Sequence, residues 1–320
     1  MAKKEQYTFQ SADGVTAIHG VRWLPDHGSV KAVLNITHGM VEYIERYGEF
    51  AGWLTDRGYA VYGHDHIGHG DSVQSPEEWG IMHAKHPADV MTADMLQDVR
   101  LGKQLWPDVP FYMLGHSMGS YLLRMFLARY AAEYARGNSS DIQGAVIMGT
   151  GTVPDGTIRF GLFLLQVLAL FHGWEYKSPF TAGLMYGKPY KKYNLDGTEP
   201  ENSWLSKNVE NVRHYYQDPK CTFQFSLGAY RGLLEACLYD NQAENVNRTP
   251  KDLPVLFVSG MDDPVGDLGE GVKAAYLKFK KAGMQDAAIR LFNNDRHEIL
   301  NETDRENVYE VLLSWMQERA

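Results

Sequence analysis

Short apolar segments alternate with helical patterns through the first half of the chain. Apolar runs bounded by turn residues predict buried strands over residues 31–37, 59–65, 111–115 and 144–148. Apolar residues at helical spacing predict helices over residues 46–57, 89–106 and 118–135. Because continuous apolar strands separated by helices are buried on both sides, the pattern indicates a mostly parallel central sheet with helices on both faces. Residues 8–10 and 17–23 are expected to pair as antiparallel strands at one edge.

The alternation stops near residue 153 and resumes after residue 247. Between these positions aromatic, methionine and glycine residues are dense, and no regular succession of strand and helix signals is visible. Beyond the segment, strands are predicted over residues 254–260 and 288–293, and helices over residues 269–282 and 303–317. The pattern therefore predicts an α/β core formed by residues 1–152 and 248–320, interrupted by an inserted helical cap over residues 153–247.

Composition narrows the classes of function. The 320 residues include 31 basic and 40 acidic side chains, which gives a formal net charge of −9. An acidic chain without a basic run is not expected to bind nucleic acid. The two cysteines, Cys221 and Cys237, are too few for a disulfide framework and favour a reducing compartment. The N-terminus lacks a signal-peptide pattern, and the longest apolar run, residues 160–171, is shorter than the ~20 residues that span a bilayer. A soluble, cytoplasmic protein is therefore expected.

The segment GHSMG, residues 115–119, lies between a predicted strand and a predicted helix. A glycine on each side of the central serine lets strand and helix pack closely, and the tight turn projects the hydroxyl of Ser117 from the sheet. The helix that starts there directs backbone N–H groups toward developing oxyanion charge. We therefore expect Ser117 to be a nucleophile and the backbone N–H of Met118 to be one oxyanion donor.

A nucleophilic serine requires a base, and the base requires an acid that orients it. In a fold with this strand–turn–helix motif, the acid and then the histidine follow the serine along the chain. Asp263 lies just past the strand predicted after the cap, with Asp262 as its rival and Asp267 as a more distant alternative. His297 follows the last predicted strand and is the only histidine after His214, which makes it the candidate base.

A second oxyanion donor is expected in the loop after the strand predicted over residues 31–37. The sequence there is His38-Gly39-Met40. Gly39 permits an unusual backbone angle, which would turn the N–H of Met40 toward the site beside that of Met118. The side chain of His38 is interpreted as a structural hydrogen-bonding group, because Ser117 already has a candidate base.

The segment HDHIGHGD, residues 64–71, contains three histidines and two aspartates and could suggest a zinc site. Its spacing matches no zinc pattern with a mechanistic basis. Gly68 and Gly70 instead indicate a tight loop shaped by hydrogen bonds. No metal and no cofactor are expected.

Motifs in chain order across nearly the whole sequence carry a resemblance to a known family. They are HGMVEYIERY (38–47), DHIGHGDS (65–72), GHSMGS (115–120), GMDDPVGD (260–267) and RHEILNE (296–302). Together they resemble the α/β-hydrolase superfamily, and within it the monoacylglycerol lipase and lysophospholipase group, especially its bacterial lysophospholipase-like branch. The resemblance implies Ser117 as the nucleophile, Asp263 rather than Asp262 as the acid, and His297 as the base. It also implies the N–H groups of Met40 and Met118 as oxyanion donors.

The cap shows no motif of the family that the rest of the chain resembles. The resemblance implies that this part of the protein sets substrate specificity. Its apolar and aromatic side chains offer a tunnel for an acyl chain. The candidate substrate contacts are Phe160, Phe163, Leu164 and Tyr186. The run over residues 160–171 is expected to be a buried helix of the cap, and transient contact of this run with a membrane surface is the open alternative.

The function expected from these features is hydrolysis of a carboxylic ester through an acyl-enzyme. A small lipid-like ester, monoacylglycerol or lysophospholipid, is the expected substrate. Hydrolysis of other small esters or of amides is an alternative, because the same three catalytic groups support all of these reactions. A more remote alternative is a binding protein of the same fold without catalytic activity. The sequence does not indicate whether the protein is a monomer or an oligomer.

Overall fold

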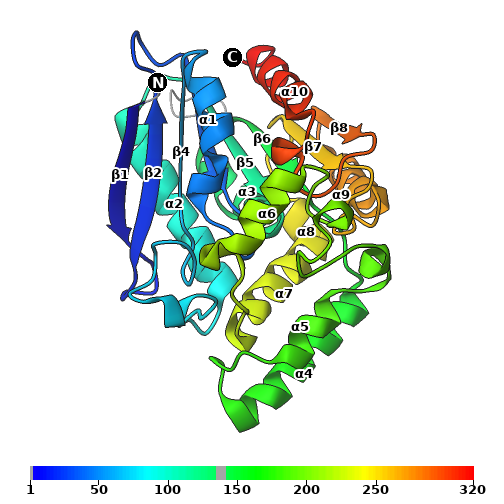
Figure 1. The fold of residues 1–320 in the computed structure, drawn as a ribbon. Helices are drawn as coiled ribbons and strands as arrows, with labels where there is room; N and C mark the ends of the chain where they lie inside the picture. The colour runs from blue at the N-terminus through cyan, green and yellow to red at the C-terminus, as the bar shows by residue number, and fades with distance from the viewer. Residues whose placement is uncertain (1–2, 135–141) are drawn as a thin grey trace.

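A computed structural model describes residues 3–134 and 142–320. These residues form an eight-stranded sheet with the order β1-β2-β4-β3-β5-β6-β7-β8 (Figure 1). The strands are β1 (Lys3–Gln10), β2 (Ala17–Leu24), β3 (Ala32–Thr37), β4 (Tyr59–His64), β5 (Phe111–His116), β6 (Ile142–Met148), β7 (Val255–Gly260) and β8 (Ala287–Phe292). β2 pairs antiparallel with β1 and with β4, and the remaining pairs are parallel. The mostly parallel sheet and its antiparallel edge are therefore confirmed.

Helices cover both faces of the sheet. The helices of the core are α1 (Gly48–Thr55), α2 (Pro87–Leu105), α3 (Met118–Tyr130), α9 (Glu270–Lys281) and α10 (Arg305–Gln317). Alternate strand residues face opposite sides, so Val33 and Met113 pack with α2, α3 and α9, whereas Leu34 and Leu114 pack with α1 and α10. The structure has the α/β-hydrolase architecture expected from the sequence.

Two predicted helices differ from the observed ones at their ends. The helix predicted from residue 46 begins as a 3₁₀ turn, Ile44–Tyr47, and continues as α1. Arg46 and Tyr47 direct their side chains into a buried polar cluster, which periodicity does not anticipate. The helix predicted over residues 118–135 ends as α3 at Tyr130 and is followed by a 3₁₀ turn, Ala131–Tyr134; residue 135 lies outside the described residues.

The segment between β6 and β7 contains helices and turns in place of strands of the sheet. Its α-helices are α4 (Asp155–His172), α5 (Pro179–Met185), α6 (Val209–Gln217), α7 (Leu227–Asn241) and α8 (Ala243–Val246). α4 packs against α7, and α7 packs against α2 and α3 of the core. α4 and α5 lie farthest from the sheet (Figure 1). The division at residues 153 and 247 stays a prediction.

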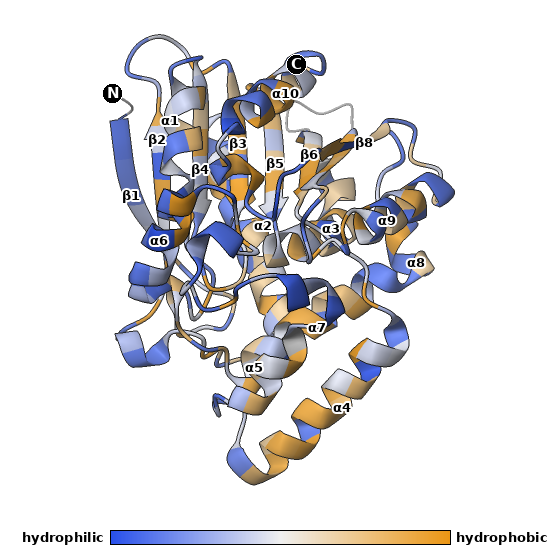
Figure 2. Cartoon of the chain, turned by 45° about the vertical axis from the view of Figure 1, so that its right-hand side comes forward, coloured by the Kyte–Doolittle hydropathy of each residue, from blue (hydrophilic) through white to orange (hydrophobic). Residues whose placement is uncertain are grey.

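Helix α4 exposes most of its apolar surface. Ile158 and Leu165 are buried, whereas Phe160, Phe163 and Phe171 are 66%, 65% and 79% exposed. Figure 2 shows the helix at the lower edge of the molecule, hydrophobic over much of its length. The expectation that residues 160–171 form a buried helix is therefore wrong.

The helix that contains this run is also longer than the run itself. The run is part of an 18-residue helix, because the chain is already helical from Asp155. Among the described residues, α4 is the one helix long and apolar enough to cross a membrane, with a mean hydropathy of 1.2. Length alone therefore does not exclude contact of α4 with a membrane.

Candidate active site

Ser117 lies in a sharp turn between β5 and α3. Its backbone has φ 52° and ψ −120°, a conformation that is strained for a residue with a side chain. Its N–H donates to the carbonyl oxygen of Met148, which fixes the turn to the neighbouring strand. A Cβ atom at Gly115 would lie 2.4 Å from the carbonyl oxygen of Gly119, and one at Gly119 would lie 2.2 Å from that of Thr37. The two glycines therefore permit the close strand–helix packing that exposes the serine.

Asp263 and His297 come together in the loops that follow β7 and β8. Oδ2 of Asp263 lies 3.0 Å from Nδ1 of His297 and also accepts a hydrogen bond from the hydroxyl of Ser259. Oδ1 accepts from the N–H of Val265. Burial raises the pKa of Asp263, but the charge and hydrogen bond of His297 and the hydrogen bonds from Val265 and Ser259 together hold that pKa below its usual range. Asp263 is thus an ionised partner for His297.

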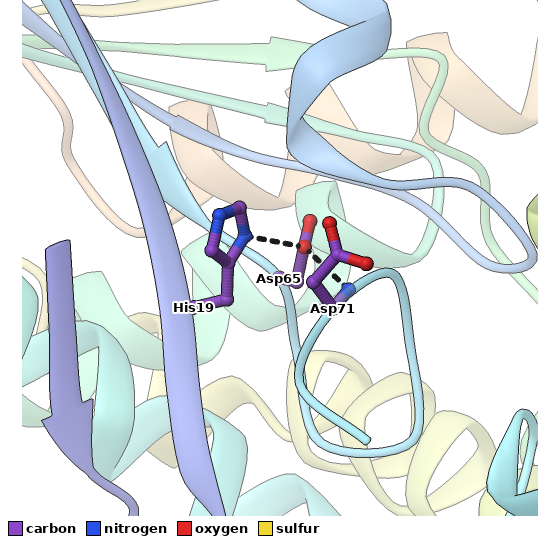
Figure 3. A group of neighbouring side chains, drawn as sticks. All are labelled: His19, Asp65 and Asp71. Carbon is purple, nitrogen blue, oxygen red and sulfur yellow. Dashed lines mark hydrogen bonds and ion pairs between the residues drawn. The ribbon is translucent and has the colours of Figure 1, made fainter. Parts of the chain in front are cut away.

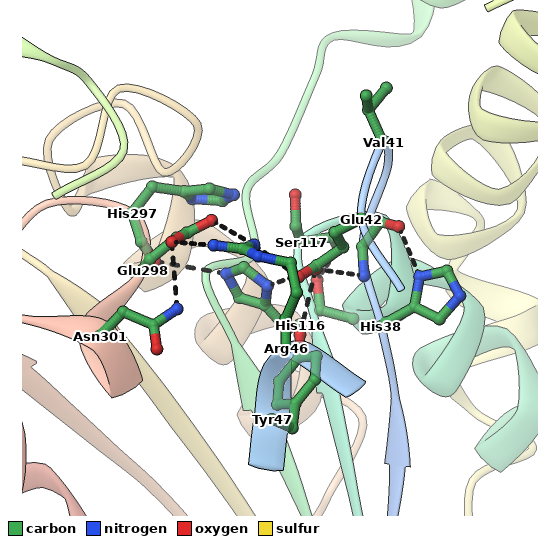
Figure 4. Close-up of polar contacts among 12 residues, drawn as sticks. His38, Val41, Glu42, Arg46, Tyr47, His116, Ser117, His297, Glu298 and Asn301 are labelled. Atoms are coloured by element: carbon green, nitrogen blue, oxygen red, sulfur yellow. Dashed lines mark hydrogen bonds and ion pairs between the residues drawn. The ribbon is translucent and has the colours of Figure 1, made fainter. Parts of the chain in front are cut away.

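The alternatives to Asp263 do not occupy this position. The carbonyl oxygen of Asp262 accepts a hydrogen bond from the hydroxyl of Tyr193, and Asp267 is exposed. His297 and Ser117 line the same cavity, and the ring of His116, the residue before Ser117, lies 4.7 Å from that of His297, centroid to centroid (Figure 4). The structure therefore brings together the serine, the histidine and the aspartate expected from the sequence.

Met40 lines the same cavity as Ser117, and Met118 directly follows Ser117 in the chain. Within residues 3–134 and 142–320, neither backbone N–H has a hydrogen-bond partner, so both are free to bind an oxyanion. Gly39 is required for space rather than for an unusual angle, because a Cβ atom there would lie 2.8 Å from Cβ of Ser117. The left-handed residue of this loop is instead Val41, with φ 55°.

A buried polar cluster beneath Ser117 was missed by the sequence reasoning. It consists of Glu42, Arg46, Tyr47, His116 and Glu298, and is called the Glu42 cluster here (Figure 4). The Glu42 carboxylate accepts hydrogen bonds from the N–H of Gly39 (2.5 Å), the hydroxyl of Tyr47 (3.0 Å), Nδ1 of His116 (2.9 Å) and Arg46 (3.1 Å). Arg46 also donates two hydrogen bonds to Glu298, at 2.7 and 2.8 Å. These bonds connect the loops that follow β3, β5 and β8.

His116 is a cation in this cluster. Its Nδ1 faces the Glu42 carboxylate and its Nε2 lies 3.3 Å from the carbonyl oxygen of His297, and both partners can only accept. Burial lowers the pKa of His116, but the charges of Glu42 and Glu298 and the hydrogen bonds to Glu42 and to the His297 carbonyl together raise it, so the net pKa is raised. Burial likewise opposes ionisation of Glu42, yet the charge of His116 and Arg46 holds its pKa far below the ordinary value. His116 therefore ties Glu42 to the backbone of His297.

The sequence does contain a signal for this cluster. Glu42 and Arg46 are spaced i, i+4 directly after the predicted oxyanion loop, and His116 directly precedes Ser117. A carboxylate, a guanidinium and an imidazole beside three predicted catalytic loops could have been read as one network. The cluster joins three separate segments of the chain, however, and sequence spacing does not pair them.

A cavity of about 530 Å³ opens over Ser117 between the core and the cap. Its apolar and aromatic lining includes Tyr186, Trp204, Leu205, Phe223, Phe225 and Tyr230. The ring of Trp204 lies 5.1 Å from that of His297, centroid to centroid. Tyr186 thus lines the cavity, as the sequence suggested, and the other five were not anticipated.

Phe160, Phe163 and Leu164 lie outside the cavity, which corrects their expected role as substrate contacts. They belong to α4, which packs on α7, and Phe160 and Phe163 are exposed. The apolar composition of α4 does not show which cap helix lines the cavity. In the structure α7 does so through Tyr230.

Strand β2 and the loop after β4 together provide the one candidate cation group among the described residues. Ligand atoms of His19, Asp65 and Asp71 lie within 4.8 Å of one another (Figure 3). Oδ2 of Asp65 already accepts from Nδ1 of His19 and from the N–H of Asp71, and Oδ1 accepts from the N–H of Ile44. Asp71 is paired with Lys220. These contacts occupy the carboxylates and shape the tight loop that the sequence predicted.

The family model described as serine aminopeptidase, S33, matches residues 28–304 of the chain. The chain belongs to this hydrolase family. Since the fold and the site agree with that assignment, the protein is an α/β-hydrolase of the S33 family.

Relatives of this S33-family hydrolase include monoacylglycerol lipases. The human monoglyceride lipase is 26% identical over 93% of this chain and 86% of its own length. The monoacylglycerol lipase of Mycolicibacterium smegmatis is 24% identical over 98% of this chain and 97% of its own length. A solved carboxyl esterase from Bacillus coagulans, in complex with glycerol, has a TM-score of 0.87 at 23% identity and covers 100% of this chain and 99% of its own. The chain is thus similar to monoacylglycerol lipases.

Proposed function

We propose that this protein is a serine hydrolase that cleaves an acyl ester of monoacylglycerol or lysophospholipid type. The observation that carries the proposal is the hydrogen-bonded Asp263–His297 pair, whose histidine lines the same largely apolar cavity as Ser117. The relatives that are named monoglyceride lipase support the ester class and favour monoacylglycerol within it.

The proposed reaction uses an acyl-enzyme intermediate. His297 removes the proton from the Ser117 hydroxyl, whose oxygen attacks the ester carbonyl carbon. The N–H groups of Met40 and Met118 bind the oxyanion of the tetrahedral intermediate. Asp263 holds Nδ1 of His297 and stabilises its protonated form. His297 then protonates the leaving alcohol, the acyl group remains on Ser117, and water deprotonated by His297 releases the fatty acid.

The cavity lining supports an acyl chain as the bound group. Side chains of Trp204, Leu205, Phe225 and Tyr230 provide apolar surface near Ser117. Each CH₂ group buried there contributes about 0.8 kcal/mol of binding free energy, which is about fourfold in kcat/KM. A long acyl ester is therefore favoured over a short one.

The exposed face of α4 supports transient contact with a membrane surface. Phe160, Phe163, Leu170 and Phe171 are exposed on α4, and Phe180 is exposed on the adjoining α5. An apolar face beside the cavity suits a helix that lies in the membrane interface while Ile158 and Leu165 remain packed in the cap. In this proposal the helix lies on the bilayer and does not cross it, and the substrate enters from the lipid phase.

A cytoplasmic location is part of the same proposal. Cys221 and Cys237 are both free and buried in the structure. Burial raises the pKa of both thiols well above the ordinary value, so they remain protonated packing groups. Two unpaired thiols are compatible with a reducing compartment.

Turnover across a graded substrate panel tests the proposed function. The panel holds 1-monoacylglycerols, lysophosphatidylcholines, p-nitrophenyl esters and the matching anilides, each with acyl chains of increasing length. We expect kcat/KM for the esters to rise with chain length through about eight carbons at up to about fourfold per CH₂. Ser117→Ala is the control and should abolish the activity. A flat or inverse chain-length dependence, or faster hydrolysis of the anilides, would contradict the proposal.

A further inference from the structure

Cap helix α6 contacts two of the loops that form the active site. The hydroxyl of Tyr215 donates to the carbonyl oxygen of Val41, at 3.1 Å. One turn earlier, Nδ2 of Asn211 donates to Oε2 of Glu298, at 2.8 Å. Val41 directly follows Met40, and Glu298 directly follows His297. One face of a single cap helix therefore binds next to the second oxyanion donor and next to the base.

Val41 has an unfavourable backbone conformation, which contacts with other residues must stabilise. It is β-branched and adopts φ 55°, a left-handed conformation that is strained for a residue with such a side chain. Its N–H donates to Nε2 of His69, at 3.4 Å. Burial lowers the pKa of His69 to about 3, so this imidazole is neutral and can accept. The core thus holds the N–H of Val41, and the cap holds its carbonyl group through Tyr215.

Other contacts fix Tyr215 in place. The guanidinium of Arg46, a member of the Glu42 cluster, lies 4.9 Å from the centroid of the Tyr215 ring. At the end of α6, the carboxylate of Asp218 accepts a hydrogen bond from the hydroxyl of Tyr43, at 2.7 Å. Tyr43 and Arg46 belong to the same segment as Val41, so the contact between α6 and this loop is made at several points along the chain.

We propose that Tyr215 is a positioning residue for the reaction, which rests on the proposed serine-hydrolase function. By holding the carbonyl group of Val41, it fixes the backbone between Gly39 and Glu42 and thereby the direction of the Met40 N–H. Because Tyr215 belongs to the cap, the oxyanion site is complete only when α6 is seated on the core. The cap then acts on the chemical step as well as on substrate binding.

The substitution Tyr215→Phe tests this inference, because it removes the hydroxyl and retains the ring over Arg46. The substrate is p-nitrophenyl acetate, whose acyl group is too short to depend on the apolar lining. We expect kcat to fall about tenfold, less than the 10²–10³-fold typical of a lost oxyanion donor, with KM changed by less than about twofold. The rate is expressed per Ser117 that reacts with a fluorophosphonate, so partial unfolding does not alter the result.

The matched control is Tyr112→Phe. The hydroxyl of Tyr112 also donates to a backbone carbonyl, that of Met316, but it lies at the opposite end of β5 from Ser117. This variant should retain the wild-type kcat while losing a similar hydrogen bond. Equal kcat values for Tyr215→Phe and wild type, or a loss that appears only in KM, would overturn the inference.

A second readout separates positioning from a structural effect. The inhibition constant of a trifluoromethyl ketone, which forms an oxyanion on reaction with Ser117, should rise by the same factor by which kcat/KM falls. An unchanged inhibition constant would also overturn the inference. Ser117→Ala distinguishes the two levels: if it remains active, the proposed function fails, whereas an inactive Ser117→Ala with a fully active Tyr215→Phe removes only the role of Tyr215.

Discussion

The two glycines beside Ser117 determine whether the serine can occupy its turn. A Cβ atom at Gly119 would lie 2.2 Å from the backbone oxygen of Thr37, which cannot move without shifting β3. We expect Gly119→Ala to lower the free energy of unfolding by about 1–3 kcal/mol and to reduce kcat, because α3 must move away from the sheet.

Urea unfolding and ester turnover check this expectation, with Gly156→Ala as the control. A Cβ atom at Gly156 in α4 meets nothing within 4 Å, so alanine there should leave stability unchanged or raise it by up to about 1 kcal/mol. Equal stability and activity of the two variants would contradict the role given to Gly119.

The charge on His116 predicts a pH dependence of stability. Its folded-state pKa is raised, so its contribution is fully present below the unfolded value of about 6.5 and is lost as the pH rises through the folded value. We expect His116→Gln to cost about 1–3 kcal/mol at pH 6, because it removes one of the two cations that face the buried Glu42 and leaves only Arg46, and to cost less at pH 9. Urea unfolding of both proteins across this range measures the difference. A cost that is constant or larger at pH 9 would show that His116 is not the cation.

At the residue scale, a candidate catalytic residue could be predicted from the sequence where a short local motif identifies it. Ser117 is defined by its own turn, and His297 by its place after the last strand. The residues alone left Asp262 and Asp263 open, and the resemblance favoured Asp263, whose carboxylate lies 3.0 Å from His297. The Glu42 cluster escaped prediction because its bonds join residues up to 252 positions apart.

Helix α4 is the element for which periodicity was least informative. A helix that is apolar on nearly every side gives no indication of which face packs. In the structure Ile158 and Leu165 are buried, and the phenylalanines at 160, 163 and 171 are exposed. The position of α7 beneath α4 decides this, and that position depends on contacts with α2 and α3.

The exposed face of α4 predicts binding to lipid. We expect the double substitution Phe163→Ser and Phe171→Ser to weaken partitioning onto phosphatidylcholine vesicles by at least about tenfold, because each buried phenylalanine contributes about 1.5–3 kcal/mol. Sedimentation with vesicles measures the partitioning, and p-nitrophenyl acetate turnover should remain unchanged. Zwitterionic lipid is used because the net charge of −9 gives no attraction to anionic head groups.

The control for lipid binding is Leu277→Ser. Leu277 is 60% exposed on α9, outside the cap, and its replacement should leave partitioning unchanged. Equal losses in both proteins, or no vesicle binding by the wild type, would contradict an interfacial role of α4.

At the scale of the whole molecule, the parallel sheet explains how distant residues meet. Met40, Ser117, Asp263 and His297 follow β3, β5, β7 and β8, whose carboxyl ends lie along one edge of the sheet. This arrangement was predictable because strand order along the chain and helix-separated apolar runs imply it. The position of the cap on the core could not be predicted, because it depends on side-chain contacts such as that between Tyr215 and Val41.

The central claim is that Ser117 is the nucleophile activated by His297. Mass spectrometry of the protein after reaction with a fluorophosphonate tests it most directly, because this reagent phosphonylates a serine only where a base and oxyanion donors activate it. The account predicts a single adduct on the peptide that contains Ser117, no adduct in Ser117→Ala, and much slower labelling of His297→Ala. An adduct on another residue, or equal labelling of Ser117→Ala, would contradict it.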